Sequence, residues 1–355
     1  MQQVDNFLDG KIAEVIPALG NLFKLESLRP LFIILGLLSV AGFFFNFLSA
    51  FWRYFLRPGK NLKKFGEWAV VTGATDGIGE AMAKELAKKG LNIIIVSRNS
   101  EKFEWNYDKV TKKETKGSSL GFGLDLAKKA IKETRGCENI QVETVNVDFK
   151  NFDQAAKDLV AEKIKGKKIG VLVNNVGESY DHCEYFHNLQ DKKVGDLLKM
   201  NVDSAVWMTK IVMSQMIKGD EKGSGAIVNI GSGSSLVISP LLAEYVGCKA
   251  FVEKMSRAMN YEYASKGIHV QCQSPMMVAT KLSKVKKASL FTPDPKVYAK
   301  AAIAAIGYES VCSPYWPHAF QIWALNCLPD WLHSKIIYDM HVDIRKRALK
   351  KSKEN

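Results

Sequence analysis

The chain has 355 residues, of which 47% are hydrophobic and 25% charged, and its formal net charge is +13. This composition excludes an intrinsically disordered chain and a polytopic transporter alike. A single α/β domain needs roughly 250 residues, so the length predicts a folded domain with an attached segment. The positive excess falls in residues 53–64, 281–287 and 341–355, which favours basic patches beside membrane-facing segments over a nucleic-acid surface.

Residues 31–52 form an uncharged stretch of 22 residues, LFIILGLLSVAGFFFNFLSAFW. A helix of this length covers the roughly 30 Å hydrocarbon core of a bilayer, so we predict a transmembrane helix. A cleaved signal peptide is the alternative, but its shorter apolar stretch would start close to the N-terminus. Five positive residues follow the stretch closely and two precede it, which predicts that the following domain faces the cytosol. Apolar residues within 1–30, interrupted by Pro17, suggest an interfacial helix or an ordinary packing helix.

A strand, a glycine-rich turn and a helix follow the basic linker 53–65. Residues 68–71 (WAVV) read as a buried strand that runs into TGATDGIG, residues 72–79, and then into a helical pattern that ends at Gly90. The glycines allow a tight turn close to a pyrophosphate, which the helix N-terminus stabilises. The next apolar run, 93–96, is a parallel-strand candidate that ends where a ribose-binding residue belongs. We therefore predict a Rossmann-type, doubly wound parallel α/β sheet.

The end of this second strand favours NADP(H). Ser97 and Arg98 stand where an NAD-specific site usually carries a carboxylate, and Arg98 can pair with a 2′-phosphate. A solvated surface arginine is the alternative. Further strands are expected at 145–148, 170–173 and 226–230, and we interpret the polar stretch 99–140 as a helix plus a surface insertion.

A catalytic constellation follows the strand 226–230. Ser232 precedes Tyr245 by thirteen residues, and Lys249 lies four residues further on, so Tyr245 and Lys249 share one helix face. A neighbouring ammonium stabilises a phenolate and lowers a pKa that is otherwise about 10. The spacing predicts that Tyr245 donates a proton near neutral pH.

These motifs resemble the short-chain dehydrogenase/reductase family over residues 66–285. The resemblance rests on TGATDGIG, NNVG, the MNV that contains Asn201, Ser232, and Tyr245-x-x-x-Lys249. Within the family the chain is most similar to the membrane-bound very-long-chain 3-oxoacyl-CoA reductases, which include 17β-hydroxysteroid dehydrogenase-like members. That similarity rests on the N-terminal anchor, NNVG, PLLAEY, SPMMVATK and the basic tail. Met276 departs from the glycine that many members carry after the proline.

The resemblance implies a role for each matched residue. Tyr245 would protonate the substrate oxygen, Ser232 would hydrogen-bond it, and Lys249 would tune Tyr245 and contact the nicotinamide ribose. Asn201 would help to hold a water-linked proton relay. The residues implied to line NADPH or NADP+ are Gly73, Thr75, Asp76, Gly77, Ile78, Gly79, Ser97, Arg98, Asp148, Asn175, Val176, Gly177, Tyr245, Lys249, Val278 and Thr280.

Three of these assignments have simpler alternatives. The hydroxyl of Ser232 could satisfy a turn, Asn201 could bond to the helix backbone, and Asp148 could cap a strand end. We expect no metal site, because His182 and His187 have no second ligand pair in view. The six cysteines show no CxxC pair and are interpreted as reduced thiols.

The remaining segments point to a membrane. The lysines of 281–300 could meet CoA phosphates or anionic lipid head groups. The uncharged, aromatic residues 311–329 are expected to dip into the membrane interface or to line an acyl channel. Lys351 and Lys353 have the KxKxx spacing of an endoplasmic-reticulum retrieval signal. The expected organisation is an N-terminal segment 1–30, a transmembrane helix 31–52, a linker 53–65, a catalytic domain 66–285, a substrate-loop and membrane-associated region 286–340 and a cytosolic tail 341–355.

The expected activity is NADPH-dependent reduction of a long-chain 3-oxoacyl-CoA to the 3-hydroxyacyl-CoA in fatty-acid elongation at the endoplasmic reticulum. A steroid or retinoid dehydrogenase is the alternative, and the sequence leaves this choice open because both substrates are apolar. A catalytically idle scaffold is a third reading, against which the intact Ser232, Tyr245 and Lys249 argue. Expected partners are the apolar substrate, the membrane, other elongation enzymes and a second copy in a homodimer, but no nucleic acid.

Overall fold

The structure is a computed structural model, and it describes residues 25–98, 123–217, 223–285 and 287–354. The chain divides into two units, Met1–Arg57 and Pro58–Asn355. Most of the segment 1–30 and residues 99–122 of the polar stretch lie outside the described residues, so the predictions made for them stay predictions.

The first unit contains the apolar helix that the sequence predicts. Helix α2 (Leu25–Phe51) continues into one wide π-helical turn, η1 (Trp52–Leu56). Among the described residues, Pro30–Leu56 is the one helical stretch long and apolar enough to cross a membrane, with a mean hydropathy of 2.4 over its best window. Its large apolar side chains are exposed, Phe45 to 73%. A helix that is apolar on every side is typical of a membrane span.

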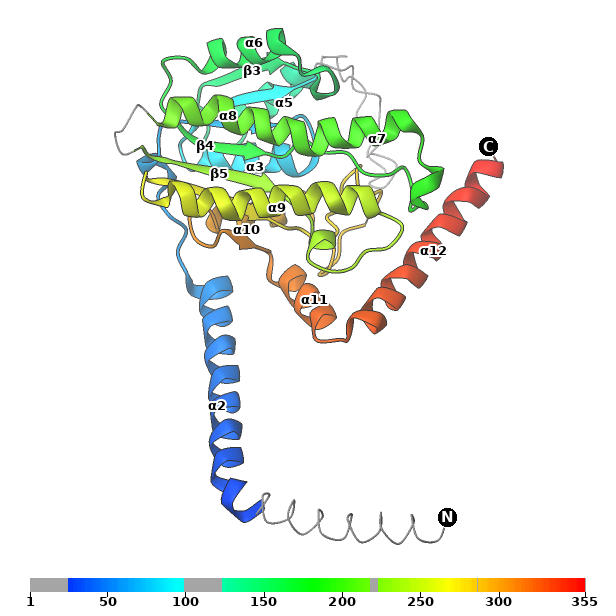
Figure 1. Ribbon diagram of the computed structural model, residues 1–355. Helices are drawn as coiled ribbons and strands as arrows, with labels where there is room; N and C mark the ends of the chain where they lie inside the picture. The colour runs from blue at the N-terminus through cyan, green and yellow to red at the C-terminus, as the bar shows by residue number, and fades with distance from the viewer. Residues whose placement is uncertain (1–24, 99–122, 218–222, 286, 355) are drawn as a thin grey trace, which may run out of the picture. The chain divides into compact units, whose positions relative to one another are not determined.

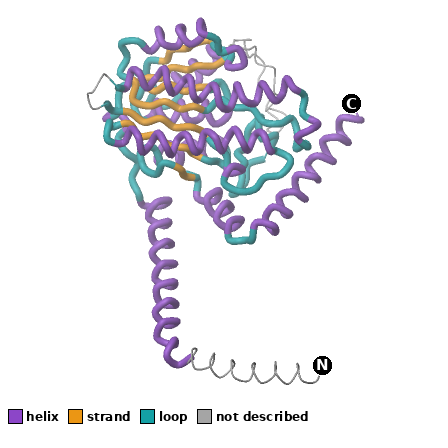
Figure 2. The backbone as a smooth tube through the Cα atoms, in the orientation of Figure 1, coloured by secondary structure: helices purple, strands orange, loops and turns teal. Residues whose placement is uncertain are grey.

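The second unit is built on a sheet of seven parallel strands in the order β3-β2-β1-β4-β5-β6-β7 (Figures 1 and 2). The strands are β1 (Trp68–Thr72), β2 (Asn92–Ser97), β3 (Val142–Asn146), β4 (Ile169–Asn174), β5 (Gly225–Ile230), β6 (Ile268–Gln273) and β7 (Val311–Cys312). The strand order reverses between β1 and β4, which defines a doubly wound sheet and makes the carboxyl ends of these strands its binding edge. The predicted fold class is confirmed.

Helices cover both faces of this sheet (Figure 1). One face packs against α3 (Gly77–Lys88), α5 (Gly123–Lys132) and α10 (Pro295–Ala304), and the other against α6 (Gln154–Ile164), α8 (Ser204–Met216) and α9 (Ala243–Ala264). Successive strand residues alternate between the two cores, so that Val70 faces one helical layer and Val71 the other. Helix α5 confirms the helix expected within 99–140.

The remaining elements connect the strands or form the C-terminal part of the chain. They are the helices α7 (Asp191–Leu198), α11 (Trp316–Asn326) and α12 (Asp330–Glu354), the π-helical turn η5 (Lys199–Asp203), and the short 3-10 turns η2 (Leu62–Lys64), η3 (Phe149–Asn151), η4 (Phe186–Asn188) and η6 (Gly233–Ser235). The aromatic segment 311–329 thus forms the edge strand β7 and helix α11, and most of the expected tail 341–355 continues α12.

Candidate active site

The glycine-rich turn between β1 and α3 forms a backbone cradle. Gly73 and Gly77 have φ of +65° and +60°, a left-handed conformation that glycine adopts without steric cost. A Cβ at Gly79 would lie 2.5 Å from the carbonyl oxygen of Gly73, so only glycine fits there. The Asp76 carboxylate accepts a 2.8 Å hydrogen bond from the Gly77 N–H and caps α3. The cradle opens at a helix N-terminus, and it fits a pyrophosphate.

Residues at the end of β4 hold this cradle in place. The Thr72 hydroxyl accepts hydrogen bonds from the N–H groups of Asn175 (3.0 Å) and Val176 (3.1 Å). In return the Asn175 amide donates to the carbonyls of Thr72 (3.1 Å) and Gly73 (3.2 Å). The structure therefore places Asn175 and Val176, two residues predicted to line the cofactor, against the glycine turn, and it gives Asn175 a role in shaping the turn.

The predicted ribose end lies at the carboxyl ends of β2 and β3. Ser97 is buried, and its hydroxyl oxygen lies 3.2 Å from that of Thr75 in the glycine turn. Arg98 follows directly and is exposed. The Asp148 carboxylate accepts a 3.0 Å hydrogen bond from the Lys150 N–H, so it caps η3. A capping role is the simpler alternative that the sequence left open for Asp148.

Helix α9 and the end of β5 bring together Tyr245, Lys249 and Ser232. The Lys249 ammonium lies 5.8 Å from the centre of the Tyr245 ring and donates a 3.0 Å hydrogen bond to the carbonyl of Ile230, the last residue of β5. The Ser232 side chain hydrogen-bonds to Tyr245 and lies 2.8 Å from the Ser234 hydroxyl. Residues separated by up to 17 positions thus meet at one point.

The protonation equilibria of this group are set mainly by burial. Burial raises the pKa of Tyr245, and the hydrogen bond to Ser232 opposes that increase in part. Burial lowers the pKa of Lys249 to about 8. The expected lowering of the Tyr245 pKa by Lys249 is therefore not seen in the chain alone.

Asn201 occupies the wide turn η5 between α7 and α8. Its amide donates to the carbonyls of Glu178 (2.8 Å) and Leu197 (2.9 Å), and its oxygen accepts from the Glu178 N–H (3.3 Å). A Cβ at Gly177 would lie 2.8 Å from the Asn201 oxygen and 3.2 Å from the Lys249 ammonium. Gly177 therefore leaves the space in which Asn201 and Lys249 approach each other. Isolated π-helical turns of this kind occur frequently at functional sites.

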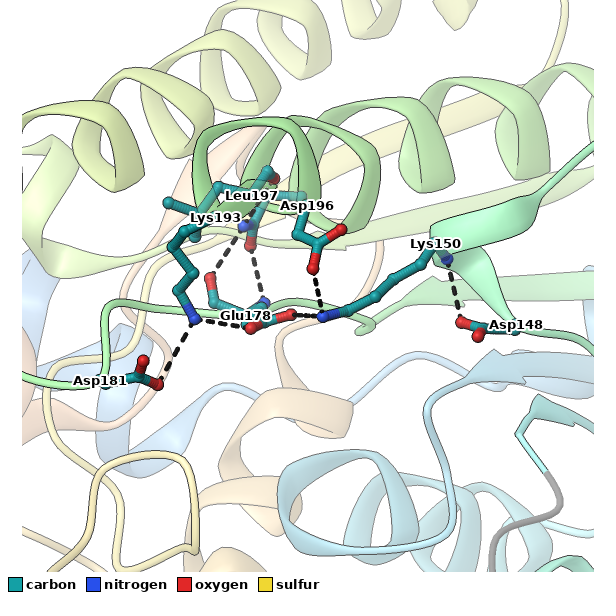
Figure 3. A network of polar contacts seen from close by, with 8 residues as sticks. Asp148, Lys150, Glu178, Asp181, Lys193, Asp196 and Leu197 are labelled. Atoms are coloured by element: carbon teal, nitrogen blue, oxygen red, sulfur yellow. Dashed lines mark hydrogen bonds and ion pairs between the residues drawn. The ribbon is translucent and has the colours of Figure 1, made fainter. Parts of the chain in front are cut away.

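A network of ion pairs surrounds the carboxylate of Glu178 (Figure 3). Lys193 and Lys150 contact it from opposite sides at 2.6 and 2.9 Å, and Lys150 also contacts Asp196 at 2.7 Å. Burial alone would raise the pKa of the Glu178 carboxyl, but the hydrogen bonds from Lys193 and Lys150 outweigh it and hold that pKa below its usual value. The outer side of the network borders an open hollow of about 350 Å³. No sequence motif marks these residues.

The loop after β6 closes the other side of the site. Val278 is buried, and a Cβ at Gly77 would lie 3.4 Å from the Thr280 methyl group, so Thr280 lies against the glycine turn. His318 from α11 holds the start of this loop: its Nδ1 accepts from the Met276 N–H at 3.2 Å, and its Nε2 lies 3.1 Å from the Met277 carbonyl. Burial lowers the pKa of His318 to about 4, so the ring is neutral at physiological pH.

His318 was not predicted as a site residue. It stands in the uncharged segment 311–329, and a lone histidine among aromatic residues carries no motif. Met276, the residue that departs from the family pattern, packs over Gly233, because a Cβ at Gly233 would collide with the Met276 thioether.

Comparison with known proteins gives consistent matches. The chain matches the family described as short chain dehydrogenase over residues 67–133 and 118–290. It is 37% identical over 292 residues to a very-long-chain 3-oxoacyl-CoA reductase of Homo sapiens, which covers 82% of this chain and 84% of that protein. A very-long-chain 3-oxoacyl-CoA reductase-like protein of Arabidopsis thaliana is 37% identical over 312 residues, 86% of this chain and 90% of its own. Hydroxysteroid dehydrogenase-like protein 1 of Gallus gallus is also 37% identical, over 81% of this chain and 80% of its own.

Solved structures share the fold at lower identity. A short-chain dehydrogenase from Sphingobium yanoikuyae, in complex with NADPH, superposes with a TM-score of 0.55 and 23% identity over 73% of this chain and 91% of its own. A 7beta-hydroxysteroid dehydrogenase superposes with a TM-score of 0.60 and 19% identity over 78% of this chain and 99% of its own. At these identities the likeness concerns the fold alone.

Proposed function

Because the chain belongs to the short-chain dehydrogenase family, whose members are oxidoreductases that act on CH–OH or C=O groups, we propose that it reduces the 3-keto group of a very-long-chain 3-oxoacyl-CoA. The product is the 3-hydroxyacyl-CoA, and the proposed place of the reaction is fatty-acid elongation. The observation that carries the proposal is the 37% identity, over 82% of the chain, to a protein named for this activity.

The family uses nicotinamide dinucleotides, and we propose NADPH for this chain. The backbone cradle at Gly73 and Gly77 suits a pyrophosphate, and Arg98 supplies a positive charge for the 2′-phosphate at the end of β2. When bound, NADPH supplies the hydride for the keto carbon. The chain itself then has to orient the ketone and to deliver a proton.

In the proposed reaction Tyr245 donates its hydroxyl proton to the keto oxygen. Ser232 contacts Tyr245, and its hydroxyl proton makes a hydrogen bond to the same keto oxygen. The keto oxygen then accepts one hydrogen bond from each residue, which fixes its position. The Lys249 ammonium stabilises the phenolate that forms. Asn201, held by the backbone of Glu178, supports the waters through which the phenolate regains a proton.

A second candidate substrate is a hydroxysteroid or its ketone. The observation that favours it is the identity to the hydroxysteroid dehydrogenase-like relative, 37% as for the acyl-CoA reductases. Oxidation of NADPH by the full-length protein, measured side by side with 3-oxostearoyl-CoA and a 17-ketosteroid, distinguishes the two. We expect kcat/KM for the acyl-CoA to be at least about 100-fold higher, since a pocket built for one substrate's polar groups leaves them unpaired with the other. The opposite ratio would overturn the acyl-CoA proposal.

We also propose that Pro30–Leu56 anchors the protein in the endoplasmic-reticulum membrane with the catalytic unit in the cytosol. The positive residues that follow the helix support this orientation. Protease protection of a C-terminal epitope in sealed microsomes tests the orientation: the epitope should be digested without detergent.

A further inference from the structure

Helix α11, orange in Figure 1, carries three aromatic side chains that are exposed to solvent. Trp316, Phe320 and Trp323 follow a spacing of four and three residues, which places them on one side of the helix. The Phe320 and Trp323 rings lie 5.7 Å apart, and these side chains are 49% and 57% exposed. Three large aromatic side chains are therefore exposed to solvent within two turns of this helix.

The opposite side of α11 is fixed in the domain. His318 and Ile322 are buried, and the His318 ring bonds to the backbone of the loop after β6 on both of its nitrogens. The helix cannot rotate to hide its aromatic face without breaking these contacts. The exposure of this face is a consequence of the fold.

A neighbouring turn extends the apolar surface. Leu290 and Phe291 are exposed, at 53% and 46%, in the turn closed by the bridge between Ser289 and Thr292. The Tyr315 hydroxyl donates a 3.0 Å hydrogen bond to the Leu290 carbonyl, and the Gln321 amide lies 3.4 Å from the Phe291 carbonyl, so the turn lies beside α11. The five exposed residues form what we call the aromatic platform: Leu290, Phe291, Trp316, Phe320 and Trp323.

Helix α11 carries no charged residue, whereas three lysines precede the aromatic platform in the chain. Residues 311–329 contain no Asp, Glu, Lys or Arg, whereas Lys281, Lys284 and Lys287 precede the Leu290 turn. Soluble proteins rarely expose contiguous apolar patches without a partner. Tryptophan rings prefer the boundary between lipid and water, and lysines beside it are attracted to anionic head groups. The chemistry of the surface matches a lipid head-group region better than a second protein.

We propose that the aromatic platform rests in the lipid-water interface of the membrane in which Pro30–Leu56 is anchored. This inference rests on the anchoring proposed above. Six residues lead from Leu56, the end of the apolar helix, to Leu62, whose side chain is buried in the second unit. They can span at most about 22 Å at 3.3–3.6 Å per residue, so the linker keeps the catalytic unit close to the bilayer. Because α11 also holds the loop after β6, the bilayer would lie close to one side of the candidate active site.

A native cysteine permits a direct test on the full chain. Cys327 is exposed and follows the last turn of α11, where its N–H donates to the Trp323 carbonyl at 3.0 Å, while Cys137, Cys183, Cys248 and Cys272 are buried. The full-length protein is placed in nanodiscs of phosphatidylcholine and phosphatidylserine and labelled with a fluorescent maleimide, with peptide mapping to select protein labelled at Cys327. Quenching by spin-labelled lipid and by aqueous iodide then reports the position of the probe.

We expect lipid quenching at Cys327 to exceed, by about threefold or more, that at a control probe in a Cys327→Ser, Tyr261→Cys variant. Tyr261 is 89% exposed on α9 and belongs to no apolar patch in our proposal. The paired substitutions Phe320→Glu and Trp323→Glu should increase the quenching of the Cys327 probe by aqueous iodide and decrease its quenching by lipid. NADPH binding should stay intact.

Two outcomes overturn the proposal. Equal iodide quenching at both probe positions would place the aromatic platform in water. Protection of Cys327 from both quenchers, with a dimer in chemical cross-linking, would assign the surface to a second copy of the chain. Failure of the anchoring itself is recognised separately, because the protein would then not co-elute with nanodiscs.

Discussion

The side-chain amide of Asn201 donates a 2.8 Å hydrogen bond to the main-chain carbonyl of Glu178. The carboxylate of the same Glu178 is held between Lys193 and Lys150 (Figure 3). A surface network of ion pairs is thus connected, through one residue, to the side chain proposed to support the proton relay. We infer that Glu178 is a positioning residue for Asn201.

Glu178→Gln should lower kcat without changing the affinity for NADPH. The substitution keeps the backbone contacts with Asn201 but removes two partly exposed ion pairs, each with a free energy of about 0.5–1 kcal/mol, so we expect a loss of about 5- to 30-fold at most. Steady-state kinetics and NADPH fluorescence titration measure the two quantities. Glu162→Gln, which removes an exposed ion pair with Lys165, is the matched control and should behave as wild type. Equal losses in both variants would mean that Glu178 has no specific connection to Asn201.

Tyr245→Phe should abolish turnover and leave NADPH binding nearly unchanged. The ring can still pack on α9, whereas the proton that the hydroxyl donates is lost, so the effect should fall on kcat. Positioned general acids typically contribute about 10²–10⁴-fold. Retention of more than about a tenth of the wild-type kcat would remove Tyr245 from the role of proton donor.

The sequence predicts the parts of the fold that depend on local patterns. The strands β1, β2, β4 and β5 are short apolar runs, and the glycine turn and the Tyr245–Lys249 pair depend on spacing within one turn or one helix. Such features are readable because the residues that define them are neighbours in the chain.

The missed features depend on tertiary contacts. Glu178, Lys150 and the pair Lys193 and Asp196 come from three separate segments of the chain, and His318 lies about 40 residues from the loop that it holds. Strand β7 has only two residues, too few for any periodicity. No local pattern records a contact between residues that only the completed fold brings together.

Arg98→Asp should shift the cofactor preference from NADPH toward NADH. The substitution removes a positive charge at the end of β2 and places a carboxylate where a ribose hydroxyl could donate to it. The ratio of kcat/KM for NADPH to that for NADH should fall by about tenfold or more. Lys89→Asp, which makes the same charge change at the opposite end of α3, is the control and should leave the ratio unchanged. An unchanged ratio in Arg98→Asp would show that the 2′-phosphate is held elsewhere.

The kcat/KM for NADPH should fall as the pH rises through about 8. Burial lowers the pKa of Lys249 to about 8, so the free enzyme loses this ammonium, which we propose to contact the ribose, above that pH. The dissociation constant of NADPH in the Tyr245→Phe variant, measured from pH 6.5 to 9.5, removes the phenol from the titration. Affinity that stays constant over this range would contradict a requirement for charged Lys249.

The buried ring of His318 should make the stability of the fold depend on pH. Burial lowers its pKa from 6.5 to about 4, so between these values the unfolded chain binds a proton that the folded chain excludes. Stability contributed by neutral His318 is therefore complete above pH 6.5 and is lost as the pH falls toward 4, by about 3 kcal/mol at most. In thermal unfolding of the full-length protein at pH 7.5 and 4.5, His318→Gln should show a smaller decrease in Tm between the two values than wild type. His187→Gln, at an exposed histidine, should keep the wild-type decrease. If all three proteins lose the same amount, other groups control the acid sensitivity and the contact of His318 with Met276 does not contribute to it.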